Sequence, residues 1–145
     1  MNATSEDERT VPTREPEKQG AKELAGRTAL VVDDSMLIRH TVCRHLEALG
    51  FRLETATNGA EAIALLGNLR PDVIITDLLM PEMGGRELIT QIKGNPELAA
   101  IPIIVLAAKV KKNYDPEETR ADVIIYKDIE IEQQLDLALG RVLGK

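Results

Sequence analysis

The sequence has very few aromatic residues: among 145 residues there are two tyrosines, one phenylalanine and no tryptophan. Surfaces on which bases stack are built from such rings, so the composition argues against a stacking platform. Positive charge is also scarce, because 18 Lys and Arg stand against 24 Asp and Glu, for a net charge of −6. Binding to nucleic acid needs clustered positive charge that displaces counterions, so no direct contact with nucleic acid is expected.

Cysteine occurs once, at Cys43, so an internal disulfide is excluded. Cys43 lies among Ile38, Val42 and Leu46 at helical spacing, which predicts a small apolar packing residue. No N-terminal apolar segment resembles a signal peptide or a transmembrane helix. A cytoplasmic protein without membrane insertion is therefore expected.

Large apolar residues are almost missing from residues 1–26, which carry mixed charges and two prolines, Pro12 and Pro16. Such a segment cannot bury enough surface to offset the entropy of ordering it. We expect a mobile polar tail over residues 1–26 and one globular domain over residues 27–145.

From Arg27 onward, short apolar runs alternate with amphipathic stretches. This alternation predicts an α/β fold, a doubly wound parallel sheet with helices on both faces. The expected five strands are residues 28–33, 51–56, 72–77, 102–108 and 122–127. Helices are expected after each strand except the fourth. Between the fourth and fifth strands, residues 109–121 have too few apolar positions, so that helix should be short or irregular, one or two turns from Pro116.

Acidic residues follow two of the expected strands. Asp33 and Asp34 come directly after the first strand, and Asp77 ends the third. One Asp would serve as an ordinary helix N-cap, but two in a row exceed what capping needs. If these strands are neighbours, the three carboxylates converge and repel one another unless a cation joins them. The pattern predicts a hard divalent ion that prefers oxygen ligands, Mg²⁺.

The residues at the strand ends resemble the receiver domain of bacterial response regulators in two-component systems, a chemotaxis-regulator-like fold. The resemblance covers nearly all of residues 27–145. It rests on VVDDS, IITDLLMPEMGG and IPIIVLAA, and on Lys127 at the end of the fifth strand. Acid pair, single acid and lysine in this order, each at a strand end, form a specific pattern. The resemblance implies strand order 2-1-3-4-5.

The family's roles transfer onto matching residues of this sequence. The resemblance implies that Asp77 is the phosphoacceptor and that Lys127 contacts a phosphoryl oxygen. It further implies that Asp33, Asp34 and the main-chain carbonyl of Leu79 hold Mg²⁺ together with Asp77. A histidine kinase or a phosphotransfer protein would supply the phosphoryl group. Such a protein is not an enzyme beyond Mg²⁺-dependent self-phosphorylation and self-dephosphorylation.

Three positions depart from the family pattern. Ala107 stands where the family carries Ser or Thr, so a hydroxyl that would bind the phosphoryl group is missing. The strand-five aromatic of the family falls on Ile124, so the usual switch pair is absent. Asp128 follows Lys127 in place of Pro, which adds a negative charge near the site. The chemistry is expected to be retained and the readout altered.

Two functions from different classes compete. One is a single-domain response regulator that is phosphorylated on Asp77 and signals to an unknown downstream protein through protein contacts. The other is a pseudo-receiver, an interaction module that acts independently of phosphorylation, which the changes at Ala107 and Ile124 favour. A phosphatase with an aspartyl nucleophile usually has a second acid two positions later, where this chain has Leu79. A flavodoxin-like phosphate loop is disfavoured because the two acids after the first strand would repel a phosphate.

A partner surface is predicted on the altered side of the domain. Val110 and Tyr114 are the only large apolar residues of the segment before the fifth strand. Leu137 should point away from the apolar stripe of the last helix and extend the same surface. The competing location is the first helix, around Arg39 and Arg44.

Overall fold

A computed structural model describes residues 26–144 except residues 79, 81–82 and 109–119. The strands are β2 (Thr28–Val32), β3 (Arg52–Ala56), β4 (Val73–Asp77), β5 (Ile103–Ala107) and β6 (Val123–Tyr126). The helices are α2 (Met36–Ala48), α3 (Gly59–Leu66), α4 (Gly85–Lys93) and α6 (Ile131–Leu143). All five expected strands are present. The tail and the predicted helix beginning at Pro116 lie outside the described residues.

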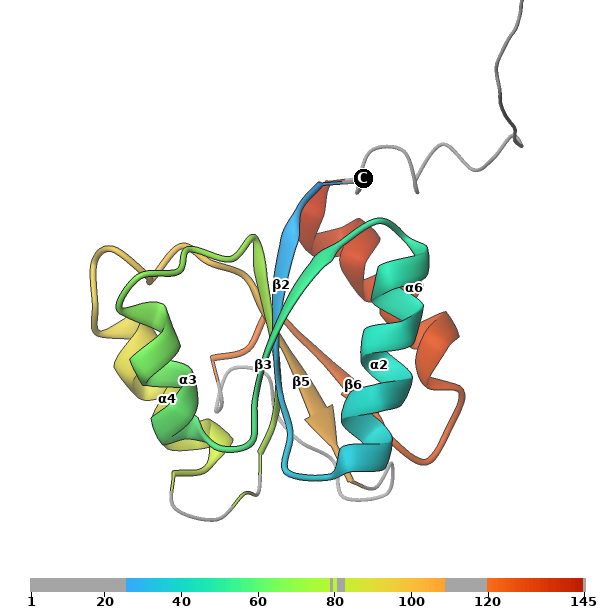
Figure 1. Ribbon diagram of the computed structural model, residues 1–145, viewed down its shortest axis with the longest axis horizontal. Coiled ribbons are helices and arrows are strands. Elements are labelled where there is room, and N and C mark those ends of the chain that lie inside the picture. The colour runs from blue at the N-terminus through green and yellow to red at the C-terminus, as the bar shows by residue number, and fades with distance from the viewer. Residues whose placement is uncertain (1–25, 79, 81–82, 109–119, 145) are drawn as a thin grey trace, which may run out of the picture.

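The strands form one parallel sheet in the order β3-β2-β4-β5-β6. This is the predicted order 2-1-3-4-5, and it places β2 directly beside β4. Helices α2 and α6 cover one face of the sheet, and α3 and α4 cover the other (Figure 1). The fold prediction is confirmed.

Two apolar cores follow from the alternation of side chains along the strands. Val31 and Ile75 point into the core beneath α2 and α6, where Leu46 and Leu135 are fully buried. The intervening strand residues point into the core beneath α3 and α4; among them are Leu30, Val32 and Ile74. Because both faces are covered, β2, β4 and β5 read as continuous apolar runs.

The helix starts are fixed by short polar side chains. Ser35 caps α2, since its hydroxyl accepts a hydrogen bond from the Ile38 amide at 3.3 Å. Asn58 caps α3 through the Glu61 amide at 2.8 Å. The Glu61 carboxylate reaches back to the Thr57 amide at 2.7 Å, one residue before the position expected from capping-box spacing.

The second helix is shorter than its apolar stripe predicts. The apolar stripe of Ala62, Ile63, Leu66 and Leu69 predicts a helix that reaches Leu69, but α3 ends at Leu66 with Gly67 as its C-cap. Glycine is a poor helix former, and the following residues form a turn that still leaves Leu69 partly buried. Within the described part of the chain, no helix is long and apolar enough to cross a membrane.

Candidate functional site

The carboxyl edge of the sheet gathers the predicted acids. Asp33 directly follows β2 and is fully buried, and Asp77 is the last residue of β4, with 6% of its surface exposed. Asp34 is exposed. One carboxylate oxygen of each of the three lies within 4.8 Å of the others. The convergence expected if β2 and β4 are neighbours is therefore present.

Asp33 has one carboxylate oxygen that the protein leaves poorly satisfied. Its Oδ1 accepts a hydrogen bond from the Ser35 amide at 2.8 Å. Its Oδ2 is buried and makes no hydrogen bond, although Lys127 Nζ lies 3.2 Å away, close enough for an ion pair. A buried charged oxygen is costly unless it is paired and fully coordinated. The orphaned oxygen, beside two further carboxylates, fits a hard cation that prefers oxygen ligands.

Lys127 lies between the two buried acids. Its Nζ is 3.0 Å from Asp77 Oδ2 as well as 3.2 Å from Asp33 Oδ2. Burial alone lowers the pKa of Lys127, but the hydrogen bond to Asp77 and the negative charges of Asp77 and Asp33 outweigh it, so the pKa is raised. The lysine is therefore held as a cation at the site. The replacement of Pro by Asp128 does not prevent Lys127 from reaching the cluster.

The surroundings of Asp77 shift the pKa of its carboxyl group in opposite directions. Burial raises its pKa, and the neighbouring charge of Asp33 adds to this, while Lys127 and the Leu78 amide favour the ionised form. The Leu78 amide donates to Asp77 Oδ1 at 2.8 Å, and Lys127 contacts Oδ2. The effect of burial outweighs that of the Lys127 and Leu78 contacts, so the pKa of Asp77 lies above its usual value.

The turn after β4 requires glycine where it passes the acid site. The Gly85 amide donates to the Leu78 carbonyl at 2.8 Å, which folds the chain back onto the strand end. A Cβ on Gly85 would overlap the carbonyl oxygen of Asp77, and one on Gly84 would lie 2.9 Å from the carbonyl oxygen of Leu78. Gly84 and Gly85 therefore have a steric reason to lack a side chain.

The remaining predicted positions are only partly placed. Ala107 ends β5 and is buried, one residue past Leu106, the register partner of Asp77. Ile124 is partly buried and packs into the core beneath α3 and α4. Leu137 is 73% exposed. The Leu79 carbonyl, Val110 and Tyr114 lie outside the described residues.

Sequence reasoning missed the contact of Arg39 with the acid pair. Arg39 Nη1 donates to the Asp33 carbonyl oxygen at 2.7 Å, which ties the second turn of α2 to the end of β2. We had considered Arg39 only as part of a competing partner surface. Its spacing of four residues from the N-cap Ser35, which places both on one side of the helix, was the available signal.

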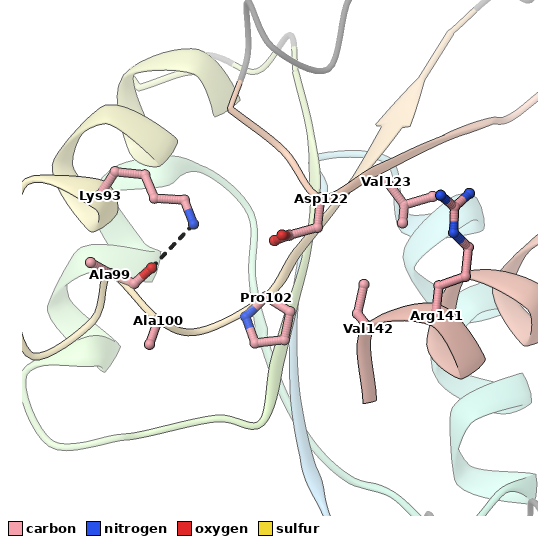
Figure 2. A pocket seen from close by; sticks show the side chains of 8 residues that line it. All are labelled: Lys93, Ala99, Ala100, Pro102, Asp122, Val123, Arg141 and Val142. Carbon is pink, nitrogen blue, oxygen red and sulfur yellow. Dashed lines mark hydrogen bonds between the residues drawn. The ribbon is translucent and has the colours of Figure 1, made fainter. Parts of the chain in front are cut away.

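A separate cavity of about 480 Å³ lies near the amino ends of β5 and β6, away from the acid cluster. Figure 2 shows its lining, which comes from the end of α4, the following turn, the starts of β5 and β6, and α6. Its polar groups serve the fold: Lys93 Nζ donates to the Ala99 carbonyl at 3.1 Å, and Asp122 Oδ2 accepts from the Ile103 amide at 2.8 Å. The acid cluster is the better candidate site.

Comparison with known proteins gives the family of the chain. The family model described as "Response regulator receiver domain" matches residues 29–138. The response regulator MprA of Mycobacterium sp. (strain KMS) is 33% identical over 108 residues, which cover 73% of this chain and 46% of that protein. The chain thus spans about half the length of this curated relative.

Solved structures give the same picture. The chemotaxis response regulator CheY4 of Vibrio cholerae is 32% identical, with a TM-score of 0.70, over 80% of this chain and 98% of that one. The Mn²⁺-bound form of response regulator Rcp1 is 27% identical, with a TM-score of 0.66, over 79% of this chain and 90% of that one.

Proposed function

Since the chain belongs to the response regulator receiver domain family of two-component signal transduction, we propose that it accepts a phosphoryl group on Asp77. The donor would be a histidine kinase or a phosphotransfer protein, and the output would be a contact with a downstream protein. The single observation that carries the proposal is the ion pair of Lys127 with Asp77 and Asp33 beside the exposed Asp34.

The surroundings of Asp77 support the proposed transfer. In the reaction, an Asp77 carboxylate oxygen forms a bond to phosphorus while the bond from phosphorus to the donor's histidine nitrogen breaks. The imidazole that leaves then takes a proton from solvent. Lys127 Nζ, 3.0 Å from Asp77 Oδ2, is placed to hold a phosphoryl oxygen. It offsets part of the charge of about −2 that the group brings.

Mg²⁺ is the proposed cofactor, held by Asp33, Asp34 and Asp77, with the Leu79 carbonyl as a fourth protein ligand. The fit rests on the buried Asp33 Oδ2, whose one contact is the ion pair with Lys127, and on three carboxylates within 4.8 Å of one another. The Mn²⁺-bound form of Rcp1, a structural relative, supports a divalent ion in this family. When bound, Mg²⁺ would neutralise negative charge on the phosphoryl oxygens and the carboxylates.

The proposal is tested by incubating the protein with Mg²⁺ and a small phosphodonor such as acetyl phosphate. Intact mass should show one added phosphoryl group in the wild type and none in Asp77→Asn. Wild-type protein that stays unlabelled, under conditions that label an ordinary receiver, would refute phosphorylation. It would leave an interaction module that acts without phosphate.

Metal binding is tested separately by titrating Mg²⁺ and following backbone amide signals by NMR. The shifts should gather at the ends of β2 and β4, and Asp34→Asn should weaken them. Asp34 is the informative variant because it is exposed and its replacement leaves the core intact. Shifts that are confined to residues 1–26 would contradict the assigned ligands.

The output surface is proposed to include Val110, Tyr114 and Leu137. Leu137 supports it, since a leucine that is 73% exposed on a helix whose other face is buried offers an apolar contact. Replacing Leu137 and Tyr114 by Ser should weaken partner binding and leave Asp77 labelling intact. Binding that survives, and fails instead with Arg44→Ala on α2, would place the partner on the other helix.

We also propose that residues 1–26 form a polar tail, that residues 27–145 form the receiver domain, and that the protein is cytoplasmic. The family's members are signalling modules rather than enzymes, and the proposed catalysis is limited to the gain and loss of the chain's own phosphoryl group.

A further inference from the structure

The strand that Lys127 directly follows, β6, is an outer strand of the sheet. β6 pairs with β5 on one side, and no other strand of the described residues pairs with it on the other. An outer strand presents unpaired backbone amides and carbonyls. At Tyr126, the last residue of β6, both of these groups are nevertheless satisfied.

Gln134 satisfies them with its side-chain amide. Its Oε1 accepts a hydrogen bond from the Tyr126 amide at 2.9 Å, and its Nε2 donates to the Tyr126 carbonyl at 2.8 Å. The primary amide of a glutamine carries the same donor and acceptor as a peptide group, so it takes the place of a neighbouring strand at this one residue. The contact joins the beginning of α6 to the end of β6.

The same amide also spans the turn between strand and helix. Nε2 lies 3.3 Å from the Glu130 carbonyl and 3.4 Å from the Ile129 carbonyl. Gln134 is partly buried, whereas its neighbour Gln133 is exposed. The turn that contains Lys127 is therefore closed by one side chain.

Lys127 follows Tyr126 directly and is held on its other side as well. Its amide donates to the Ala107 carbonyl of β5 at 2.8 Å. The backbone around Lys127 is thus held on both sides of the strand. Gln134 binds the preceding residue, Tyr126, on the outer side, and the Ala107 carbonyl of β5 accepts the Lys127 amide on the inner side. A lysine has a long flexible stem, so the position of its Nζ depends on where its backbone is held.

We propose that Gln134 is a positioning residue that holds Lys127 against Asp77 and Asp33 by clamping the Tyr126 backbone. The importance of this clamp for phosphoryl transfer rests on the function proposed above, but the positioning itself does not. Gln134 touches no reacting group and acts only through the main chain.

The test compares Gln134→Met with Gln133→Met. Methionine keeps the length and the helix propensity of glutamine but cannot make either hydrogen bond. The first readout needs no phosphate: the separation of the two Lys127 ε-proton signals in NMR, and the exchange rate of the Tyr126 amide. In Gln134→Met the ε-proton signals should move toward those of a free lysine, and Tyr126 exchange should speed up by about tenfold. Gln133→Met should match the wild type in both.

The second readout is a double-mutant cycle on the rate of Asp77 labelling. Gln134→Met should slow labelling by about tenfold in the wild-type background and have no effect in Lys127→Ala, since it acts through that lysine. Equal slowing in both backgrounds would overturn the proposal, because it would indicate a general loss of structure. Lys127 signals unchanged in Gln134→Met would overturn it as well.

A second variant checks the donor side of the clamp. Gln134→Glu retains the acceptor for the Tyr126 amide but places a carboxylate oxygen against the carbonyl oxygens of Tyr126, Ile129 and Glu130, so it should displace Lys127 at least as far as Gln134→Met does. If the wild type is not labelled at all, the proposed function fails, and the NMR readout still decides whether Gln134 positions Lys127.

Discussion

Asp77, the proposed phosphoacceptor, is a buried carboxylate whose ionisation costs stability. Burial and the neighbouring Asp33 raise its pKa above the usual value of 3.8 despite the contact with Lys127. The folded protein therefore binds this proton more tightly than the unfolded chain. Stability should fall as the pH rises from about the unfolded value through the folded pKa, and the penalty should persist above it.

The first prediction is that Asp77→Asn stabilises the metal-free protein at pH 7, because asparagine carries no charge that must be desolvated. Urea unfolding in the presence of a chelator measures the difference. Below both pKa values, where Asp77 is protonated, the advantage of the variant should shrink toward zero. A variant that is less stable than the wild type at pH 7 would show that the ion pair with Lys127 outweighs desolvation.

Cys43 carries the second prediction at this scale. Burial, with a contribution from the charge of Glu47, raises the pKa of its thiol, and the thiolate is the reactive form. Alkylation by iodoacetamide at pH 8 should be slower in the folded protein than in urea-unfolded protein by about tenfold or more. Intact mass against time gives both rates, and equal rates would contradict the packing role.

At the scale of elements, two glycines in helices differ in whether the structure leaves room for a side chain. Gly85 begins α4 against the end of β4, where a Cβ would meet the Asp77 carbonyl oxygen and lie 2.9 Å from Leu78 Cα. Both are backbone atoms, so the strand end must move. Gly140 lies in the interior of α6, and a Cβ there meets nothing within 4 Å.

Gly85→Ala should therefore destabilise the protein and slow Asp77 labelling together, because the same shift displaces the acid. Gly140→Ala should stabilise it by about 0.5–1 kcal/mol, the usual gain from replacing glycine inside a helix. Urea unfolding and labelling rates measure both variants. Normal labelling in Gly85→Ala would indicate that the loop, and not the strand end, absorbs the overlap.

The start of α3 offers a prediction about capping. Asn58 accepts the Glu61 amide at 2.8 Å, so Asn58→Ala should cost about 1 kcal/mol of stability. Asn68→Ala is the control, since Asn68 is exposed and follows the helix. Equal unfolding midpoints for the two variants would mean that tertiary contacts alone hold the helix start.

At the scale of the whole molecule, the proposed metal site would couple Mg²⁺ binding to folding. A ligand that binds only the folded protein stabilises it in proportion to the logarithm of its concentration, by about 2.7 kcal/mol at 100 times the Kd. Mg²⁺ should raise the thermal midpoint of the wild type, and the increase should be smaller in Asp34→Asn. A midpoint that does not respond to millimolar Mg²⁺ would argue against the site.

The sheet and its acids could be predicted from sequence because each depends on local order along the chain. Val31 and Ile75 lie in strands that are mostly apolar, with Asp33 directly after β2 and Asp77 as the last residue of β4. Gln134 could not be predicted in this way, since its partner is a main-chain group of Tyr126. Such contacts depend on how closely helix and strand approach, which periodicity does not determine. The end of α3 at Leu66 was missed because hydrogen-bonded turns continue the apolar stripe past the last helical residue, and the Leu69 amide still donates to the Leu65 carbonyl at 3.1 Å.

The outer strand on the side of the sheet away from β6 has a consequence for solubility. β3 is the other outer strand, and Arg52, Glu54 and Thr55 on it are exposed. An outer strand with bare backbone can recruit a strand from a second molecule and begin a fibril, and charged side chains along it resist that growth. Arg52 and Glu54 place opposite charges along five residues, which makes β3 a poor template for edge-to-edge aggregation at high concentration.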